Sequence, residues 1–371
     1  MRTDSGSFYQ YIDKSSKRKH WTFTPSEISR FNIKIDQEIT ELLIKAHHFL
    51  GIVEGMVECI PYVERFLRMM ACHDACKSCQ IDRIAVSYDA VLTGMGNSME
   101  VQSAQNCYAS FLSLPGEFFS IDWLCDLHYS VMYGILSDGA GKIRDKVFLM
   151  HPQYTSNMEE YNPPIPELVL GLLQDLQCFV LNNKNVDVFI KAALLYYQFE
   201  TIHPFYSGNG RTGRLLPIAM LMKQGGLSKG CLFISEYLFQ NDDECMNLFR
   251  NVQYFGDYME WIKFFLRCII SSSDRTVKQL DAAVKERSRT EEKLRQCPKF
   301  YEELAEIYDF IEASPVFLIK DIAHKFDISY NTAASRVAKL TEMKIVKLEK
   351  EQSRNRIFKA QRYIEVFADH Y

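Results

Sequence analysis

The sequence predicts a mainly α-helical protein, and three observations support this prediction. Apolar residues recur every three to four positions through several long segments, as they do on the buried face of a helix. Strand-like stretches are short and are confined to residues 142–150 and 346–358. The chain has 371 residues, of which 47% are hydrophobic, which is enough for a core in two or three domains. We therefore expect a helical core with one small β-hairpin, a helical N-terminal region and a small C-terminal domain.

The composition of the chain excludes some classes of protein. A net charge of −4 gives no general attraction to nucleic acid or to an anionic membrane. Residues 1–19 are polar and basic, and no apolar run approaches the roughly 18 residues that span a bilayer, so we expect neither a signal peptide nor a membrane span. The 11 cysteines are scattered and odd in number, which indicates reduced thiols. These features predict a soluble, cytoplasmic protein.

The N-terminal region, residues 1–104, is expected to be helical after a polar start. Residues 1–24 are rich in Ser and Lys and are expected to be partly ordered at best. An apolar stripe over residues 35–53 predicts a long helix, which Glu54 and Gly55 follow directly.

Three cysteines in this region suggest two different interpretations. Cys72, Cys76 and Cys79 have the spacing that binds an iron–sulfur cluster in radical enzymes that use S-adenosylmethionine. On a helix, however, these three positions lie on one face, as core residues do. No alternation of strands and helices follows them, so we interpret them as small core residues.

The central region, residues 105–275, contains four strongly periodic segments. They predict helices at 121–134, 166–182, 186–202 and 215–222. Residues 142–150 are predicted to form a short strand or hairpin arm.

The most informative motif lies between the last two of these helices. Residues 203–214 read His-Pro-Phe-Tyr-Ser-Gly-Asn-Gly-Arg-Thr-Gly-Arg. Gly208 and Gly210 have no Cβ, so the chain can turn tightly there and bring its N–H groups close to a ligand. The spacing fits neither a Walker loop nor a dinucleotide-binding fingerprint, and no strand pattern precedes it.

Three charged or titratable side chains accompany these glycines. A helix that begins near Arg211 would point its N–H groups and the positive end of its dipole into the turn. Arg211 and Arg214 are three residues apart and can project from one face of that helix. With the imidazole of His203 beside them, they predict a site for several phosphates next to a base. The alternative is a glycine-rich turn with surface arginines, but the fixed spacing of all these residues favours the phosphate site.

This motif resembles the signature of Fic proteins, His-x-Phe-x-(Asp/Glu)-Gly-Asn-Gly-Arg-x-x-Arg. Two further stretches also resemble that family, namely residues 198–202 (Gln-Phe-Glu-Thr-Ile) and the proline-rich residues 161–167. The resemblance runs from about residue 46 to the C-terminus. Fic proteins mostly transfer AMP from ATP to a hydroxyl of a target protein, so it implies a Fic core at 105–275 with that activity and with ATP as substrate.

The resemblance also assigns roles to residues of the motif. His203 would take the proton from a Ser, Thr or Tyr hydroxyl, which suits an imidazole near neutral pH. The backbone from Gly208 to Gly210 would hold the phosphates, and Asn209 would help with the α-phosphate. Arg211 would contact the β-phosphate and Arg214 the γ-phosphate, because a guanidinium binds phosphate oxygens with two bonds.

The chain departs from the family at Ser207, where Fic proteins have Asp or Glu. That carboxylate usually holds Mg²⁺, and a hydroxyl is a weaker ligand for this cation. Magnesium could still be held by ATP phosphates and water, with Ser207 bound directly or through water. The departure puts the metal site in doubt, and with it the efficiency of AMP transfer and the nature of the transferred group.

Three further features follow from the resemblance. Glu54-Gly55 is similar to the inhibitory motif (Ser/Thr)-x-x-x-Glu-(Gly/Asn), in which the glutamate pairs with the second arginine of the signature; Leu50 stands where that motif has Ser or Thr. The alternative is that Glu54 is a surface carboxylate at the end of a helix. Residues 142–150 hold the position of the family's β-hairpin flap, which binds the target segment as an added strand. Tyr237 would lie near the nucleotide, or else be an aromatic core residue.

The C-terminal part is predicted to be a helical linker, 276–300, followed by a separate domain, 301–371. Helices at 304–311, 319–326 and 330–341 precede two strands over 346–358, a pattern that resembles a winged helix-turn-helix. This end is basic, which suits contact with DNA phosphates. Nearby glutamates balance this charge, and many winged helices bind protein, so a protein partner fits equally well. The basic residues are Arg336, Lys339, Lys344, Lys347, Lys350, Arg354 and Arg356.

Three functions are consistent with these observations. The favoured one is an adenylyltransferase that modifies a Ser, Thr or Tyr hydroxyl of a target protein, or its own, and is inhibited by Glu54. The second is removal of AMP from a protein, with Glu54 orienting water. The third is a transcriptional regulator whose degenerate Fic core only binds nucleotide. A homodimer is consistent with each of them.

Overall fold

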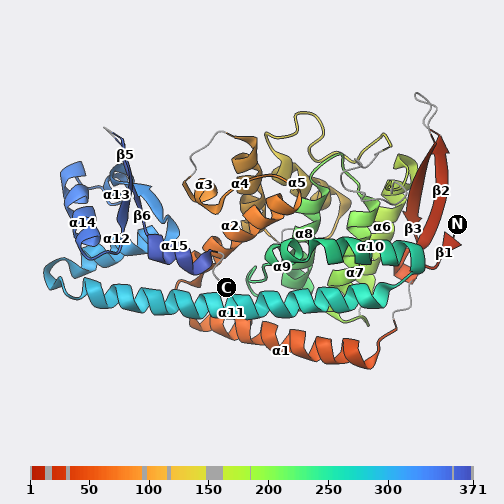
Figure 1. Ribbon diagram of the computed structural model, residues 1–371, viewed down its shortest axis with the longest axis horizontal. Coiled ribbons are helices and arrows are strands. Elements are labelled where there is room, and N and C mark those ends of the chain that lie inside the picture. Colours follow the sequence, from red (N-terminus) through yellow and green to blue (C-terminus); the bar gives the residue numbers. More distant parts are fainter. Residues whose placement is uncertain are drawn as a thin grey trace.

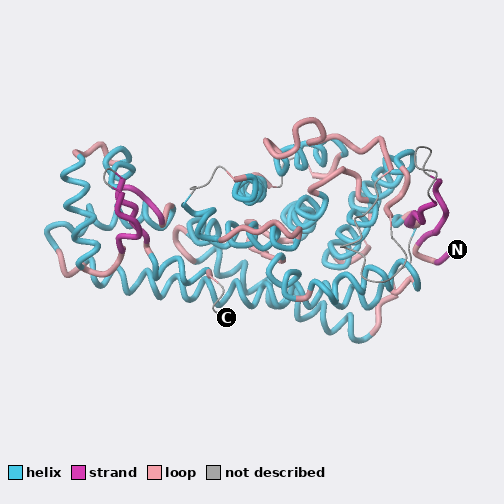
Figure 2. Tube along the Cα trace, turned by 45° about the horizontal axis from the view of Figure 1, so that its top comes forward, coloured by secondary structure: helices cyan, strands magenta, loops and turns pink. Residues whose placement is uncertain are grey.

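The computed structural model describes residues 2–12, 19–30, 34–93, 98–114, 118–147, 162–183, 185–352 and 355–368. The fold is mainly α-helical, as predicted, with two small antiparallel sheets at opposite ends of the molecule (Figures 1 and 2). No helix in these ranges is both long enough and apolar enough to cross a membrane.

A helix of 37 residues, α11 (Tyr258–Leu294), runs along most of the molecule (Figure 1). Helix α1 (Gln37–Cys59) lies beside it. Lys263 in the first turns of α11 pairs with Asp36 at 3.0 Å and with Glu38 at 2.7 Å, so the two helices start together and run in parallel. Asp36 also caps α1 by accepting a hydrogen bond from the Ile39 N–H at 2.7 Å.

Helix α11 continues without a break through residue 275, where a separate linker was expected to begin. Its buried positions recur at helical spacing beyond that point, at Leu280, Ala283 and Leu294. The segment 276–294 is therefore the second half of a packed helix. The other expected boundary, at residue 104, falls inside α4 (Met99–Leu112).

Helix α7 (Val188–Ile202) lies at the centre of the core. Almost all of its residues are buried, because its sequence is apolar on every side. Trp261 of α11 donates from Nε1 to the Ala193 carbonyl at 2.8 Å and so fixes α7 against α11. The helices around it are α5 (Ile121–Met132), α6 (Pro166–Asn182), α8 (Asn209–Met220), which continues into the π-helical turn η3 (Leu221–Gly225), and α10 (Asp242–Phe255).

Helix α2 (Val63–Ile81) connects the core with the C-terminal elements. It packs against α4 and α9 (Ser235–Gln240), and α3 (Tyr88–Thr93) follows it. Its residues from Met69 to Cys79 are all buried. Cys72, Cys76 and Cys79 lie within this buried stretch, as a core stripe would.

The N-terminus forms a sheet where partial order at best was expected. Strands β1 (Arg2–Thr3), β2 (Gly6–Ile12) and β3 (Lys19–Pro25) pair antiparallel in that order, and the turn η1 (Ile28–Arg30) follows. The rings of Phe8 and Phe23 lie 4.7 Å apart, and Phe8 stacks on Tyr254 of α10. These contacts pin the sheet to the core. The polar composition of residues 1–24 gives no indication of these contacts.

The predicted hairpin arm at residues 142–150 is not a strand over residues 142–147, and residues 148–150 lie outside the described part of the chain. At the far side of that gap, Asn162 makes a parallel bridge with Thr22 of β3. The Phe23 N–H donates to the Asn162 carbonyl at 2.9 Å.

The last part of the chain forms a compact unit, residues 298–368, which we call the C-terminal module. Three helices and two strands lie where the sequence predicted them, whereas β4 and α15 were not expected. The strands pair in the order β4-β6-β5. The elements are η4 (Pro298–Phe300), α12 (Tyr301–Ala313), β4 (Val316–Leu318), α13 (Ile319–Lys325), α14 (Tyr330–Glu342), β5 (Lys347–Gln352), β6 (Asn355–Lys359) and α15 (Gln361–Phe367).

Candidate functional site

The motif at 203–214 forms the turn between α7 and α8 and the first turns of α8. Two residues of the turn have left-handed backbone conformations, His203 with φ of 49° and Gly208 with φ of 76°. A Cβ at Gly208 would lie 2.4 Å from the Met132 sulfur, so only glycine fits there. Helix α8 begins at Asn209, two residues before the expected start, and its first N–H groups have no partner within the helix.

His203 is half-buried at the end of α7. Arg144 donates from Nε to the His203 carbonyl at 2.8 Å and holds the backbone in place. A hydrogen bond between the imidazole and the Glu200 carbonyl opposes the shift, but burial, helped by the charge of Arg144, lowers the pKa of His203 to about 4. A ring N–H that donates to this carbonyl leaves the other ring nitrogen with the lone pair that a general base needs. His203 therefore carries a neutral imidazole at pH 7.

The Asn209 side chain holds the turn closed. Its Oδ1 accepts from the Phe205 N–H at 2.9 Å, and its Nδ2 donates to the Phe205 carbonyl at 2.8 Å. The amide is thus occupied by the backbone of the turn. The contact of this side chain with an α-phosphate stays a prediction, and the structure adds a role in holding the turn.

His128 of α5 supports the same turn and was not singled out in the sequence. Its ring stacks on Phe205 with centroids 3.7 Å apart. Its Nε2 lies 2.8 Å from the Ser207 carbonyl, and its Nδ1 accepts from the Gly141 N–H at 2.8 Å. These two bonds fix a neutral ring with the proton on Nε2, and burial lowers its pKa to about 4. Nothing in the helical pattern at 121–134 identifies this histidine.

Both histidines should make the fold sensitive to mild acid. Their pKa values of about 4 lie below the ordinary value of 6.5, so the unfolded chain binds more protons between these pH values. The free energy of unfolding should therefore fall as the pH drops from 6.5 towards 4, by up to about 1.4 kcal/mol per pH unit for each ring. Urea midpoints at pH 7.5, 6 and 5 measure this loss. His128→Gln should flatten the dependence, whereas replacing the exposed His48 with Gln should not; equal slopes in all three proteins would contradict the assignment.

Arg211 and Arg214 converge on one carboxylate, that of Asp82, which directly follows α2. Arg214 Nη2 lies 2.6 Å from Asp82 Oδ1, and Arg211 Nε lies 3.0 Å from Oδ2. Arg214 also donates to the side-chain and backbone oxygens of Ser78, at 2.8 and 2.7 Å. A Cβ at Gly210 would lie 2.8 Å from Asp82 Oδ1, so glycine at this position lets the carboxylate approach.

Arg211, Arg214 and Asp82 form a cluster whose charges do not cancel. Glu200 also lies beside Arg214, but burial raises its pKa to about 8, so it is largely neutral at pH 7. Two guanidinium groups thus face the single charge of Asp82. The Nη1 atom of Arg211 is buried and has no hydrogen-bond partner. The cluster therefore keeps positive charge and an unused donor at the N-terminus of α8, which is what an anionic ligand requires.

Glu54 does not make the pair expected of it. One of its carboxylate oxygens accepts from the Ser228 N–H at 2.9 Å, and the other lies 3.1 Å from the Cys231 sulfur. The partner of Arg214 comes from α2 and not from α1. The sequence did contain the signal, because Ser78-Cys79-Gln80-Ile81-Asp82 has the spacing of the inhibitory motif with Asp in place of Glu. The match was missed because Asp82 is shorter than the Glu of the motif and because Arg83 stands where the motif has Gly or Asn.

The two remaining expected site residues are Ser207 and Tyr237. Ser207 is exposed at the turn, where its side chain meets solvent. Among the described residues, no group of three or more His, Cys, Asp or Glu side chains is arranged to hold a metal ion. Tyr237 packs against Phe264 and lines a cavity of about 170 Å³ that none of residues 203–214 lines. Tyr237 thus has the surroundings of an aromatic packing residue.

Comparison with known proteins links this site to one family. The sequence profile of the Fic/DOC family matches residues 118–221. A probable protein adenylyltransferase of Aquifex aeolicus is 39% identical over 69 residues, which are 19% of this chain and 22% of that protein. A protein adenylyltransferase of Caenorhabditis briggsae is 33% identical over 123 residues, or 32% of this chain and 22% of its own. The chain thus spans about a fifth of these curated relatives.

The fold extends the likeness beyond the matched segment. The crystal structure of a Fic family protein from Desulfovibrio desulfuricans superposes with a TM-score of 0.57. The superposition covers 88% of this chain and 97% of that one, at 17% sequence identity. Residues 118–221 therefore match the Fic/DOC family, and the chain as a whole has the fold of a Fic family protein.

Proposed function

We propose that this protein transfers AMP from ATP to a Ser, Thr or Tyr hydroxyl of a target protein, its own hydroxyls included. The observation that carries the proposal is the cluster of Arg211 and Arg214 at the N-terminus of α8, beside the neutral imidazole of His203. The names of the relatives, which are protein adenylyltransferases, support the same reaction.

In this reaction the hydroxyl oxygen attacks the α-phosphorus of ATP while His203 takes the hydroxyl proton. The bond from the α-phosphorus to the bridging oxygen breaks, and pyrophosphate leaves. The backbone N–H groups at the start of α8 stabilise the charge on the α-phosphate oxygens. Arg211 and Arg214 bind the β- and γ-phosphates, with the unpartnered Nη1 of Arg211 as the first available donor.

Asp82 inhibits this reaction in the form described here. Its carboxylate occupies the donors of Arg211 and Arg214 that the phosphates would use. It also puts a negative charge where the γ-phosphate would lie, so ATP binds with its α-phosphate out of line with the attacking hydroxyl. Asp82, and not Glu54, is thus the inhibitory carboxylate in this proposal. Removal of AMP, the alternative in which Glu54 orients water, loses its support because Glu54 is held by Ser228.

The residues of the turn are a poor fit for a protein-held Mg²⁺, since Ser207 offers only a neutral hydroxyl. Ser207→Asp should therefore make the rate of AMP transfer depend on Mg²⁺ at lower metal concentrations, because a carboxylate is the better ligand. The exposed side chain leaves room for the change. Rates measured over a magnesium titration test it, with Ser207→Asn as the neutral control. Identical titrations for the two variants would contradict the prediction.

Incubation with ATP labelled at the α-phosphate, followed by mass spectrometry of the intact protein, tests the proposed activity. Covalent addition of AMP to a Ser, Thr or Tyr is the expected result. The same incubation with ATP labelled at the γ-phosphate should leave no label, because pyrophosphate departs. Because Asp82 inhibits the parent, the incubation is repeated with Asp82→Ala; a folded Asp82→Ala protein that binds ATP but is labelled in neither case would support the rival function, a regulator with a nucleotide-binding core.

We also propose that the C-terminal module is a winged helix-turn-helix that contacts a macromolecular partner. Its basic residues differ in their availability. Arg336 pairs with Glu303, and both Arg336 and Lys339 lie over the Phe300 ring, so neither points freely to solvent. Exposed basic side chains remain at Lys344, Lys347 and Arg356. Among the side chains that the structure describes, a contact with DNA would depend on these three.

A further inference from the structure

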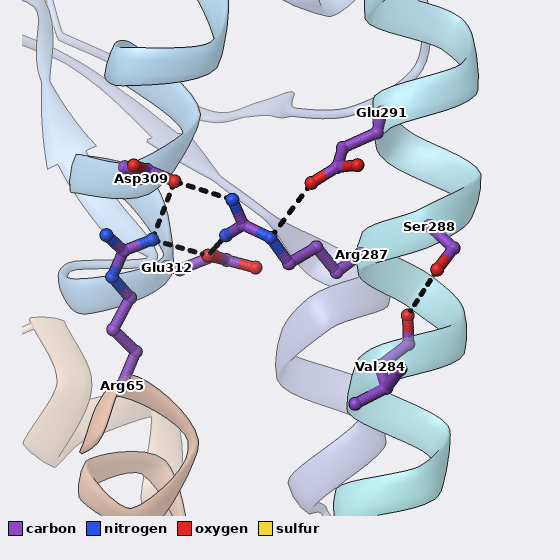
Figure 3. Close-up of polar contacts among 7 residues, drawn as sticks. All are labelled: Arg65, Val284, Arg287, Ser288, Glu291, Asp309 and Glu312. Atoms are coloured by element: carbon purple, nitrogen blue, oxygen red, sulfur yellow. Dashed lines mark hydrogen bonds and ion pairs between the residues drawn. The ribbon is translucent and has the colours of Figure 1, made fainter. Parts of the chain in front are cut away.

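The C-terminal module is joined to the core by a cluster of four charged side chains from three helices (Figure 3). Arg65 of α2 and Arg287 of α11 both point at Asp309 and Glu312 of α12. Arg65 Nη1 lies 2.6 Å from Asp309 and 2.9 Å from Glu312. Arg287 binds the same two carboxylates, with Nη2 2.9 Å from Asp309. Glu312 has no exposed side-chain surface, so this is an interior contact.

Other contacts bind the module to the same end of α2. The Phe66 ring lies 6.2 Å from the Tyr363 ring and 6.4 Å from the Phe367 ring of α15. Lys359 of β6 pairs at 2.6 Å with Asp89 of α3, the helix after α2. The module therefore holds α2 through both its first helix and its last.

Helix α2 connects this contact with the candidate site. It has 19 residues, which corresponds to a length of about 28 Å. Arg65 and Phe66 are in its first turn, whereas Ser78 is in its last turn and Asp82 directly follows it. A helix buried along most of its length moves as a unit, and displacements of 1–2 Å are usual for such shifts. A shift of about 1 Å is enough to break a hydrogen bond such as the 2.6 Å contact of Asp82 with Arg214.

We propose that docking of the C-terminal module on Arg65 and Phe66 positions α2 so that Asp82 holds Arg211 and Arg214. Release of the module from α2 then releases the two arginines for ATP. The inference rests on the proposed function, because it assumes that Asp82 inhibits AMP transfer. The C-terminal module then regulates this inhibition. A partner that pulls the module away from α2 activates the enzyme.

Reversal of one charge tests this coupling in the full chain. In Arg65→Glu, the new carboxylate faces Asp309 and Glu312, so the module should separate from α2. We expect ATP affinity and self-labelling to rise by at least about fivefold, the lower limit of usual allosteric coupling. The matched control is Arg289→Glu, because Arg289 is exposed on α11 and its ion pair within the described residues is along its own helix, with Glu286. A second charge change, Asp309→Lys in the Arg65→Glu protein, should lower ATP affinity again by restoring a pair with α2.

A milder variant covers the case in which Arg65→Glu does not fold. Tyr62 is exposed, and both Arg65 and Arg287 lie over its ring. Its φ of 58° suits asparagine, so Tyr62→Asn weakens the cluster without straining the backbone. A smaller rise in ATP affinity is expected.

Two outcomes separate this inference from the proposed function. Folded Arg65→Glu and Tyr62→Asn proteins with unchanged ATP affinity, beside an Asp82→Ala protein of higher affinity, would overturn the coupling and leave inhibition by Asp82 in place. Higher affinity in all three variants without any AMP transfer would uphold the coupling and overturn the enzymatic function.

Discussion

Replacing Asp82 with alanine should raise ATP-dependent self-labelling by about 5- to 150-fold, the range of typical coupling energies. The physical reason is competition for the same donors. Asp82 occupies Arg214 Nη2 at 2.6 Å and Arg211 Nε at 3.0 Å. Without it, both guanidinium groups can bind the β- and γ-phosphates, and the repulsion of a nearby carboxylate disappears.

The same variant should be less stable in the absence of ATP. Arg214 is a buried cation, and Asp82 balances its charge. Loss of this partner lowers the thermal midpoint, and ATP should restore it more fully than in the parent, because a ligand that binds the native state stabilises it by mass action. Thermal midpoints with and without ATP therefore report release of the arginines independently of catalysis.

Glu54→Ala is the matched control for Asp82→Ala. Both changes remove an acidic side chain at or near a helix end, but Glu54 contacts Ser228 and Cys231 and not the arginines. Self-labelling should stay at the parental level in this variant. If Glu54→Ala were activated and Asp82→Ala were not, the inhibitory carboxylate would be the one on α1.

Replacing His203 with asparagine should lower AMP transfer by about 10²- to 10⁴-fold, the usual contribution of a general base. Asparagine adopts left-handed backbone conformations readily, so the φ of 49° at this position costs little. The change is best made in the Asp82→Ala protein, where the signal is largest. Initial rates of labelling and the affinity for ATP are the two measurements.

ATP affinity should stay within a few-fold of the Asp82→Ala parent, since the phosphates are held by α8 and its arginines. A protein that binds ATP normally but no longer transfers AMP supports His203 as the base. Labelling close to that of the parent would contradict this role. A loss of ATP binding would instead indicate that His203 supports the turn.

The sequence predicted the helical elements because their apolar residues repeat with the period of the helix. Helix α6 has the predicted bounds, and α7 ends where the motif begins. The N-terminal sheet was missed because Phe8, which packs on Phe23 within the sheet, also stacks on Tyr254, a contact across nearly 250 residues that local composition does not contain. The flap was also predicted wrongly over residues 142–147, which form no strand, and its last residues, 148–150, lie outside the described part of the chain.

The site divides in the same way. The sequence alone determined the local part, namely the turn, its glycines and the imidazole and two arginines on it, because these groups are neighbours along the chain. Only the tertiary structure decided which distant side chains meet them. His128 supports the turn, Asn209 is used by its own backbone, and Asp82 instead of Glu54 holds the arginines. The physical reason is that each acid lies in a stretch that matches the inhibitory motif only in part, so local sequence does not choose between them; the packing of α2 against α4 and α9 brings Asp82 to the start of α8.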